Sequence, residues 1–325
     1  MASATKEVLI DLSPVIKQYT DGTVERLFGS PHVPPSREDP ITGVSSKDIT
    51  ISSAVSARLY LPKLTHPSQK LPILVYYHGG GFCLESAFSF LDHRYINHLS
   101  SAAGALVISV EYRLAPEHPL PAAYEDSWDA LKWVCSHVHD QNISETNFEK
   151  DEWITEHGDF NRLFIGGDSA GGNIAHNIAM RAGSESLPGN VKILGAILSH
   201  PYFWGSNPIG NEPKENIEQS LLYRIRLFVH PSATGGIDNP LINPIVDGAP
   251  SLSGLGCSKL LICLGEKDEL TGRALVYAEN VKKNGWKGEV EEVVVEGEGH
   301  CFHVFDIETE KAKDLIKKMA SFISQ

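Results

Sequence analysis

The chain has 325 residues, of which 42% are hydrophobic and 21% charged, and it carries a formal net charge of −13. This composition is that of a globular protein with a sizeable core, and the negative field opposes binding to nucleic acids or to anionic membranes. We therefore expect neither nucleic acid nor a membrane as a partner. The first eleven residues contain only a three-residue apolar run, and no apolar stretch approaches the length of a membrane span, so we expect a cytoplasmic protein.

The five cysteines are scattered along the chain and none has Cys-x-x-Cys spacing. Such thiols are typical of buried cysteines in a reducing compartment, so we expect no disulfide, no metal and no cofactor. The sequence leaves the oligomeric state open.

The predicted elements begin with two alternating runs, 48–52 and 55–61, which favour an antiparallel strand pair. Continuous apolar runs, typical of parallel strands covered on both faces, then follow at 71–77, 105–110, 163–165, 193–198, 260–264 and 292–295. Helical patterns occur at 124–138, after residue 169 and at 312–322. This alternation predicts a single α/β domain over 1–325, a mostly parallel sheet flanked by helices, with active-site residues at the carboxyl ends of the strands.

The segment Gly167-Asp168-Ser169-Ala170-Gly171 lies between one of these apolar runs and a helical pattern. It matches the G-x-S-x-G motif of a nucleophile elbow, in which glycines permit a sharp strand-to-helix turn and the serine hydroxyl projects from it. A single match can arise by chance in a chain with 28 glycines. Other parts of the sequence therefore decide whether this segment is a nucleophile elbow.

A second motif, His78-Gly79-Gly80-Gly81, directly follows the apolar run 71–77. It matches the oxyanion-hole loop that accompanies the elbow in lipases and esterases. We expect the backbone N–H groups of Gly80 and Gly81, together with that of Ala170, to converge on a developing oxyanion. Either motif alone could be an ordinary glycine turn, but two such matches in this order are much harder to obtain by chance.

A serine needs a base to take its proton, and in this fold an acid and then a histidine follow the serine along the chain. Asp268 comes just after the run 260–264, and its place in the turn favours it as the acid. Glu266 and Glu269 are the alternatives.

The base is expected just past the run 292–295, where the candidates are His300 and His303. Gly299 frees the backbone before His300 and favours that position. In the assembled site His300 would take the proton from Ser169, and Asp268 would fix its tautomer and stabilise the imidazolium.

With these residues in place, the chain resembles the plant carboxylesterases of the hormone-sensitive-lipase-like α/β-hydrolase family, nearly from end to end. The likeness is carried by residues 78–82, 112–119, 166–173, 201–203 and 300–303. Segments 55–62, 82–88 and 235–240 look most like the branch of 2-hydroxyisoflavanone dehydratases, which also includes alkaloid cyclases. The resemblance implies an α/β-hydrolase fold with a helical lid built from about 1–45 and about 204–237.

The resemblance also divides the expected functions. Dehydratases of this branch carry threonine where this chain has Ser169, the cyclases depart at the glycine loop, and the related gibberellin receptors lack the histidine. Because Ser169, Asp268, His300 and all three glycines are retained, we expect a serine carboxylesterase acting on small to medium acyl esters, such as acetylated plant metabolites. The alternative is a dehydratase or cyclase of specialised metabolism.

Several residues are candidates for the substrate pocket, although each can equally be an ordinary core or solvated residue. The candidates are Phe82, Glu85, His93, Tyr202, Phe203, Trp204, Leu221, Leu222, Tyr223 and Phe228.

Overall fold

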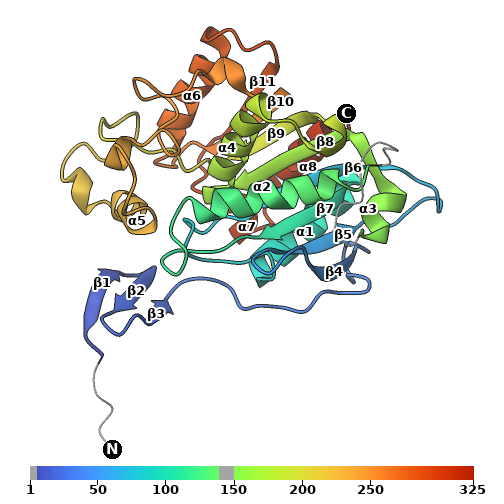
Figure 1. Ribbon diagram of the computed structural model, residues 1–325, viewed down its shortest axis with the longest axis horizontal. Helices are drawn as coiled ribbons and strands as arrows, with labels where there is room; N and C mark the ends of the chain where they lie inside the picture. Colours follow the sequence, from blue (N-terminus) through green and yellow to red (C-terminus); the bar gives the residue numbers. More distant parts are fainter. Residues whose placement is uncertain (1–5, 139–149) are drawn as a thin grey trace, which may run out of the picture.

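The computed structural model describes residues 6–138 and 150–325, and its centre is an eight-stranded sheet (Figure 1). The strand order is β11-β10-β9-β8-β6-β7-β5-β4. Neighbours are parallel from β11 to β7, whereas β5 is antiparallel to both β7 and β4. The strands are β4 Ser45–Thr50, β5 Ser56–Leu61, β6 Leu71–Tyr77, β7 Leu106–Glu111, β8 Gly158–Asp168, β9 Ile193–Ser199, β10 Cys257–Gly265 and β11 Glu289–Val295.

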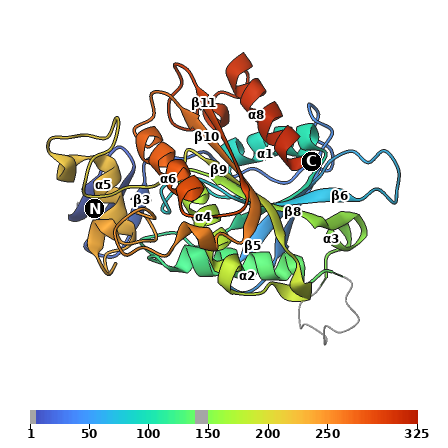
Figure 2. The same cartoon turned by 90° about the horizontal axis from the view of Figure 1, so that it is seen from above.

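Helices cover both faces of this sheet, and Figure 2 shows α1 and α8 on the opposite side from α2. Because side chains alternate along a strand, β6 sends Ile73 and Val75 into the core beneath α2, α4 and α6, and Leu74 into the core beneath α1 and α8. The helices are α1 Phe90–Ala103, α2 Ala122–Cys135, α3 Glu152–His157, α4 Ala170–Ser184, α5 Leu221–Val229, α6 Thr271–Lys283, α7 Phe302–Phe305 and α8 Glu310–Ile323.

The fold prediction is confirmed: the structure has the expected antiparallel pair and the mostly parallel sheet between helices. One strand differs from its prediction. β11 is not covered on both faces, because it is the edge strand of the sheet, and Val294 remains 46% exposed. Helix α1 was not among the predicted elements.

A second sheet of three antiparallel strands, also not predicted, lies apart from the main sheet near the N-terminus. Its strands are β1 Val8–Leu12, β2 Ile16–Tyr19 and β3 Val24–Arg26. Both views place it beside α5, where Arg224 donates a hydrogen bond to the carbonyl of Asp11 at 2.5 Å. The two segments expected to form a lid, apart from residues 1–5 outside the described part, are thus neighbours. Their action as a lid stays a prediction.

Candidate active site

Ser169 lies at the turn between β8 and α4 with φ 53° and ψ −114°, a backbone conformation that side chains rarely adopt. The flanking glycines make this turn possible. A Cβ at Gly171 would lie 1.8 Å from the carbonyl oxygen of Tyr77, and one at Gly167 would lie 2.4 Å from the same atom. The backbone passes so close that only glycine fits at either position.

The turn brings the Ser169 hydroxyl to His300, whose Nε2 lies 2.9 Å from Oγ. The other ring nitrogen, Nδ1, lies 2.7 Å from Oδ2 of Asp268. Because a carboxylate only accepts, Nδ1 carries the proton and Nε2 is free to accept from Ser169. Asp268 itself is buried and fixed by its neighbour, since its Oδ1 accepts from the N–H of Leu270 at 3.1 Å.

The competing residues lie elsewhere. Glu266 and Glu269 are exposed, and the Glu266 carboxylate accepts from the N–H of Gly297 at 2.8 Å. His303 is fully buried, its Nε2 lies 3.4 Å from Oγ of Ser199, and burial lowers its pKa to about 3. Of the alternatives, the structure therefore brings only Asp268 and His300 into line with Ser169.

The glycine loop follows β6 and faces the elbow. Gly80 and Gly81 have φ of 100° and 61°, which glycine adopts without strain. A Cβ at Gly79 would lie 2.3 Å from Oδ2 of Asp168. In the part of the chain that the structure describes, the N–H groups of Gly80 and Gly81 have no hydrogen-bond acceptor, so both are available to a bound oxygen.

His78 supports this loop from beneath. Its buried ring stacks on Tyr112 with 4.2 Å between centroids, and its Nδ1 lies 2.8 Å from the carbonyl of Gly79. Burial lowers the pKa of His78 to about 4, so the imidazole is neutral and donates to that carbonyl. Tyr112 in turn donates from its hydroxyl to the His78 carbonyl at 2.7 Å. The loop is thus held by a side-chain scaffold.

Ser169 opens into a cavity of about 210 Å³ with mostly apolar walls. The predicted residues found in its lining are Gly79, Gly80, Gly81, Glu85, Ser169, Tyr202, Leu221, Leu222 and His300. The other lining residues are Val15, Phe28, Leu84, Leu91, Asp92, Asp168, Ile225, Cys301, Val304 and Phe305. The cavity therefore joins the carboxyl ends of the strands to the N-terminal sheet and α5.

Three aromatic candidates belong to the core and do not line this cavity. Phe82 is buried between Tyr124 and Tyr202, with ring centroids 5.8 and 6.2 Å away. Phe203 packs 4.8 Å from Tyr277, beneath α6. Trp204 is also buried. Their burial depends on tertiary packing, which a local pattern does not reveal.

His93, Tyr223 and Phe228 are likewise outside the cavity. The His93 ring lies between Tyr60, whose hydroxyl is 3.1 Å from Nδ1, and Asn97, whose amide is 3.2 Å from Nε2. Phe228 lines a separate groove against the N-terminal sheet. His93 was expected to line the pocket, but the residue before it on α1, Asp92, lines the cavity instead. Predicting a helix over 90–103 would have shown that these two neighbours lie on different faces.

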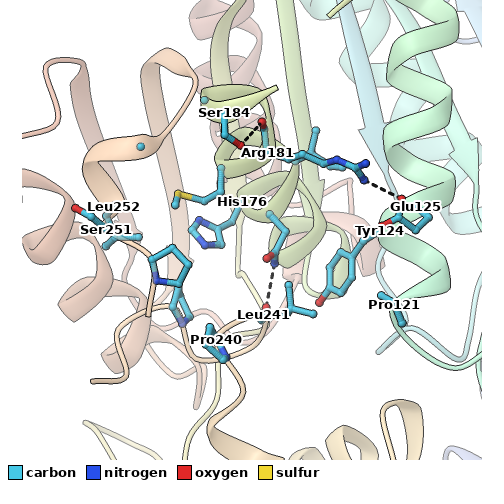
Figure 3. A pocket seen from close by; sticks show the side chains of 17 residues that line it. Pro121, Tyr124, Glu125, His176, Arg181, Ser184, Pro240, Leu241, Ser251 and Leu252 are labelled. Carbon is cyan, nitrogen blue, oxygen red and sulfur yellow. Dashed lines mark hydrogen bonds and ion pairs between the residues drawn. The ribbon is translucent and has the colours of Figure 1, made fainter. Parts of the chain in front are cut away.

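A larger cavity, of about 580 Å³, lies elsewhere and does not contain Ser169 (Figure 3). It is formed by α2, α4 and the loop 240–254, and at its edge Arg181 reaches Glu125 at 2.8 Å. Across residues 6–138 and 150–325, no group of three or more potential ligands is arranged to hold a metal ion. No helix in the same residues is long and apolar enough to cross a bilayer.

Comparisons with known proteins bear on the family and the fold. A family model described as the α/β hydrolase fold matches residues 74–304. A "2-hydroxyisoflavanone dehydratase" of Glycyrrhiza echinata is 57% identical over 99% of this chain and 100% of its own length. "Catharanthine synthase" of Catharanthus roseus is 50% identical over 98% and 96%, and "Probable carboxylesterase 2" of Arabidopsis thaliana is 43% identical over 100% and 99%.

Solved structures give the same result for the fold. A hyperthermophilic esterase from Pyrobaculum calidifontis superposes with a TM-score of 0.69 at 29% identity, covering 88% of this chain and 84% of that one. The metagenomic carboxylesterase EstE1 superposes with a TM-score of 0.70 at 27% identity, covering 88% and 90%. The chain is therefore a member of the hormone-sensitive-lipase-like α/β-hydrolase family, in the branch that holds 2-hydroxyisoflavanone dehydratases, alkaloid synthases and plant carboxylesterases.

Proposed function

We propose that this protein is a serine carboxylesterase that hydrolyses small to medium acyl esters, such as acetylated plant metabolites, through an acyl-enzyme on Ser169. The observation that carries the proposal is the hydrogen-bonded chain from Ser169 through His300 to Asp268, with contacts of 2.9 and 2.7 Å. It starts in a cavity of apolar walls, as an ester without charge requires.

In this reaction His300 takes the Ser169 proton at Nε2 as Oγ attacks the ester carbonyl. The N–H groups of Gly80, Gly81 and Ala170 stabilise the negative charge that develops on the carbonyl oxygen. His300 then returns the proton to the departing alcohol, and a water molecule releases the acid from Ser169 by the same steps. Asp268 keeps the imidazole oriented and stabilises its charged form.

The nucleophile is tested by Ser169→Ala. The variant should lose about 10⁴-fold or more in kcat on a p-nitrophenyl ester of a short acid, and it should no longer be labelled by a fluorophosphonate. Ser184→Ala is a matched control, since Ser184 is an exposed serine at the far end of the same helix. Equal turnover by Ser169→Ala and wild type would show that another group carries the reaction.

A dehydratase or cyclase is the second candidate, because a relative with 57% identity is named as a dehydratase. The same pocket would then stabilise an anion without attack by the serine. Mass spectrometry of a quenched reaction with the natural substrate separates the two. Hydrolysis predicts an acyl group on Ser169 and severe impairment of Ser169→Thr, because the added methyl group hinders attack of Oγ on the ester carbonyl, whereas a reaction without that attack needs only a hydroxyl that can donate. A fully active Ser169→Thr variant with no adduct in the wild type would establish the second candidate instead.

A further inference from the structure

Asp92 lies on the wall of the cavity that contains Ser169, in the first turn of α1. The residue is only 3% exposed. Its Oδ2 lies 3.0 Å from Oγ of Ser89, and within the described residues no other group forms a hydrogen bond with its side chain. Oδ1 therefore has no partner in the protein, and it belongs to a carboxyl group that lines the substrate cavity.

The other two carboxyl groups in the cavity lining are already satisfied. Asp168 accepts from the hydroxyl of Tyr76 at 2.7 Å, and Glu85 accepts from both the N–H and the hydroxyl of Ser30 at 2.9 and 3.0 Å. No lysine or arginine is among the residues that line the cavity. An anionic substrate would therefore find no lysine or arginine to pair with, and the three acidic groups would oppose it. Asp92 is the carboxyl group with a free oxygen for a ligand.

The hydrogen bonds of Ser89 are compatible with a proton on Asp92. The single hydroxyl proton of Ser89 has two potential acceptors, the carbonyl of Ser86 at 2.8 Å and Oδ2 of Asp92 at 3.0 Å. If Ser89 donates to Ser86, the contact with Asp92 is satisfied only when Asp92 is protonated and donates from Oδ2. Oδ1 is then a carbonyl oxygen that accepts.

The surroundings favour this neutral form. Burial, and then the negative charges of Asp168 and Glu85, raise the pKa of Asp92 well above its ordinary value, and Glu111 adds to the increase, while the hydrogen bond with Ser89 lowers the pKa by less. The N-terminus of α1 acts in the opposite direction, because a helix N-terminus stabilises an anion. That stabilisation is small beside the cost of charging a buried carboxyl among other acids.

We propose that Asp92, as a neutral carboxylic acid, binds a hydroxyl group of the substrate. The substrate hydroxyl donates to Oδ1, Asp92 donates from Oδ2 to Ser89, and Ser89 donates to the carbonyl of Ser86, so that every proton has one acceptor. The preferred substrates are accordingly uncharged esters that carry a hydroxyl group. This inference rests on the proposed function for the place where the ester binds.

The test measures binding rather than hydrolysis, and it uses Ser169→Ala so that the ligands stay intact. The probes are three pairs of benzyl-type esters that differ by one hydroxyl group: lactate and propanoate, 3-hydroxybutyrate and butyrate, 4-hydroxybenzyl acetate and benzyl acetate. At least one hydroxylated ester should bind about 3- to 10-fold more tightly than its partner, as one added hydrogen bond predicts.

Two substitutions of Asp92 in that background identify the interaction. Asp92→Asn should keep the preference, because its amide oxygen accepts and its NH₂ group donates to Ser89 as the neutral acid does. Asp92→Leu should abolish it. Asp129→Asn, at an exposed acid on α2, is the control and should change nothing. Absence of a preference in all three pairs, or its survival in Asp92→Leu, would overturn the proposal.

Infrared difference spectra at pH 7 test whether Asp92 is a neutral acid. They use no ligand and do not depend on the folding of Asp92→Leu. The difference between wild type and Asp92→Asn should contain the carboxylic-acid band of a protonated side chain, because Asp168 and Glu111, whose pKa values are also raised, are present in both proteins and cancel. Absence of the band from this difference would overturn the proposal, as would binding of the cation acetylcholine by wild type that is lost in Asp92→Asn, because either result means an ionised Asp92. A hydroxyl preference together with an inactive wild type would refute the esterase function and leave this inference standing.

Discussion

The cavity has two sides that are built differently. On the elbow side, the backbone is packed so closely that a Cβ at Gly79, Gly80, Gly167 or Gly171 would lie 1.8 to 2.4 Å from another atom. On the opposite side, α5 and the N-terminal sheet contribute apolar side chains, and Arg224 joins the two by one hydrogen bond to Asp11. Close packing of the backbone fixes the proposed catalytic groups on one side, whereas apolar side chains form most of the wall on the other. Substitutions on the two sides should therefore affect the proposed reaction and the range of substrates separately.

The largest expected effect tests the elbow side. His300→Ala should lower ester turnover about 10⁴-fold, comparable to removal of the nucleophile, because Ser169 loses its proton acceptor. His303→Ala should keep most of the activity, since the His303 ring contacts Ser199 and lies outside the hydrogen-bonded chain that starts at Ser169. Initial rates on a p-nitrophenyl ester measure both. The reverse order of effects would move the base by three residues.

The steric argument itself is tested by Gly171→Ala. The new methyl group would meet the Tyr77 carbonyl at 1.8 Å, so strands or helix must move, and we expect a loss of about 3 kcal/mol or more in the free energy of unfolding. Gly254→Ala is the control, because its nearest atom is the flexible end of Met180 at 3.7 Å. Urea unfolding measures both. Similar stabilities would show that the elbow is more adaptable than this packing implies.

The opposite side should respond with a smaller, different effect. Phe28 is 50% exposed at the cavity wall and packs on Phe305 with 6.2 Å between ring centroids. Phe28→Ala should raise KM for an aryl ester about 3- to 10-fold with kcat nearly unchanged, because it removes contact made equally in the ground and transition states. Ile41→Ala, 76% exposed in the same N-terminal segment, should change neither constant. A fall in kcat alone would assign Phe28 to the chemistry.

A further effect concerns the pH dependence of stability rather than activity. Burial lowers the pKa of His303 to about 3 and that of His78 to about 4, whereas an unfolded histidine titrates near 6.5. Above pH 6.5 both histidines are neutral in the folded and in the unfolded state, so they do not change the free energy of unfolding. Below it the unfolded chain takes up protons that the native state refuses, so stability falls by about 1 kcal/mol per histidine and pH unit until the folded pKa is reached.

The measurement is urea unfolding of wild type and His303→Asn between pH 7 and pH 5. Asp92 and Asp168 act in the opposite direction, because their raised pKa values favour proton uptake by the native state as the pH falls. The difference between the two proteins therefore isolates the histidine, and the variant should lose stability less steeply. Parallel curves would mean that His303 titrates normally in the native state.

The contrast between the two sides also explains what the sequence revealed. The elbow and the glycine loop could be predicted from the sequence, because the backbone is so crowded there that only glycine fits. This requirement produces a recognisable motif. Asp268 and His300 followed from their places just after strands, since parallel strands bring their carboxyl ends together. The strand pattern predicted the main sheet for the same reason: continuous burial leaves a continuous apolar run.

The substrate side left no such pattern. Phe82 and Trp204 are aromatic, as residues of a pocket wall often are, but tertiary packing buries both in the core. Phe28 and Ile225 line the cavity but are unremarkable in the sequence. The strands of the N-terminal sheet are at most five residues long, too short to show a clear period. Apolar residues are interchangeable in a way that the reacting residues are not.

Cys301, immediately after the histidine of the relay, has a consequence for inhibitor chemistry. Its thiol is buried 3.7 Å from the Asp168 carboxyl, and burial together with that negative charge raises the thiol pKa well above its ordinary value. A protonated thiol is a poor nucleophile. Alkylating agents such as iodoacetamide should consequently leave this buried thiol unmodified, and the ester turnover proposed for Ser169 should survive such treatment.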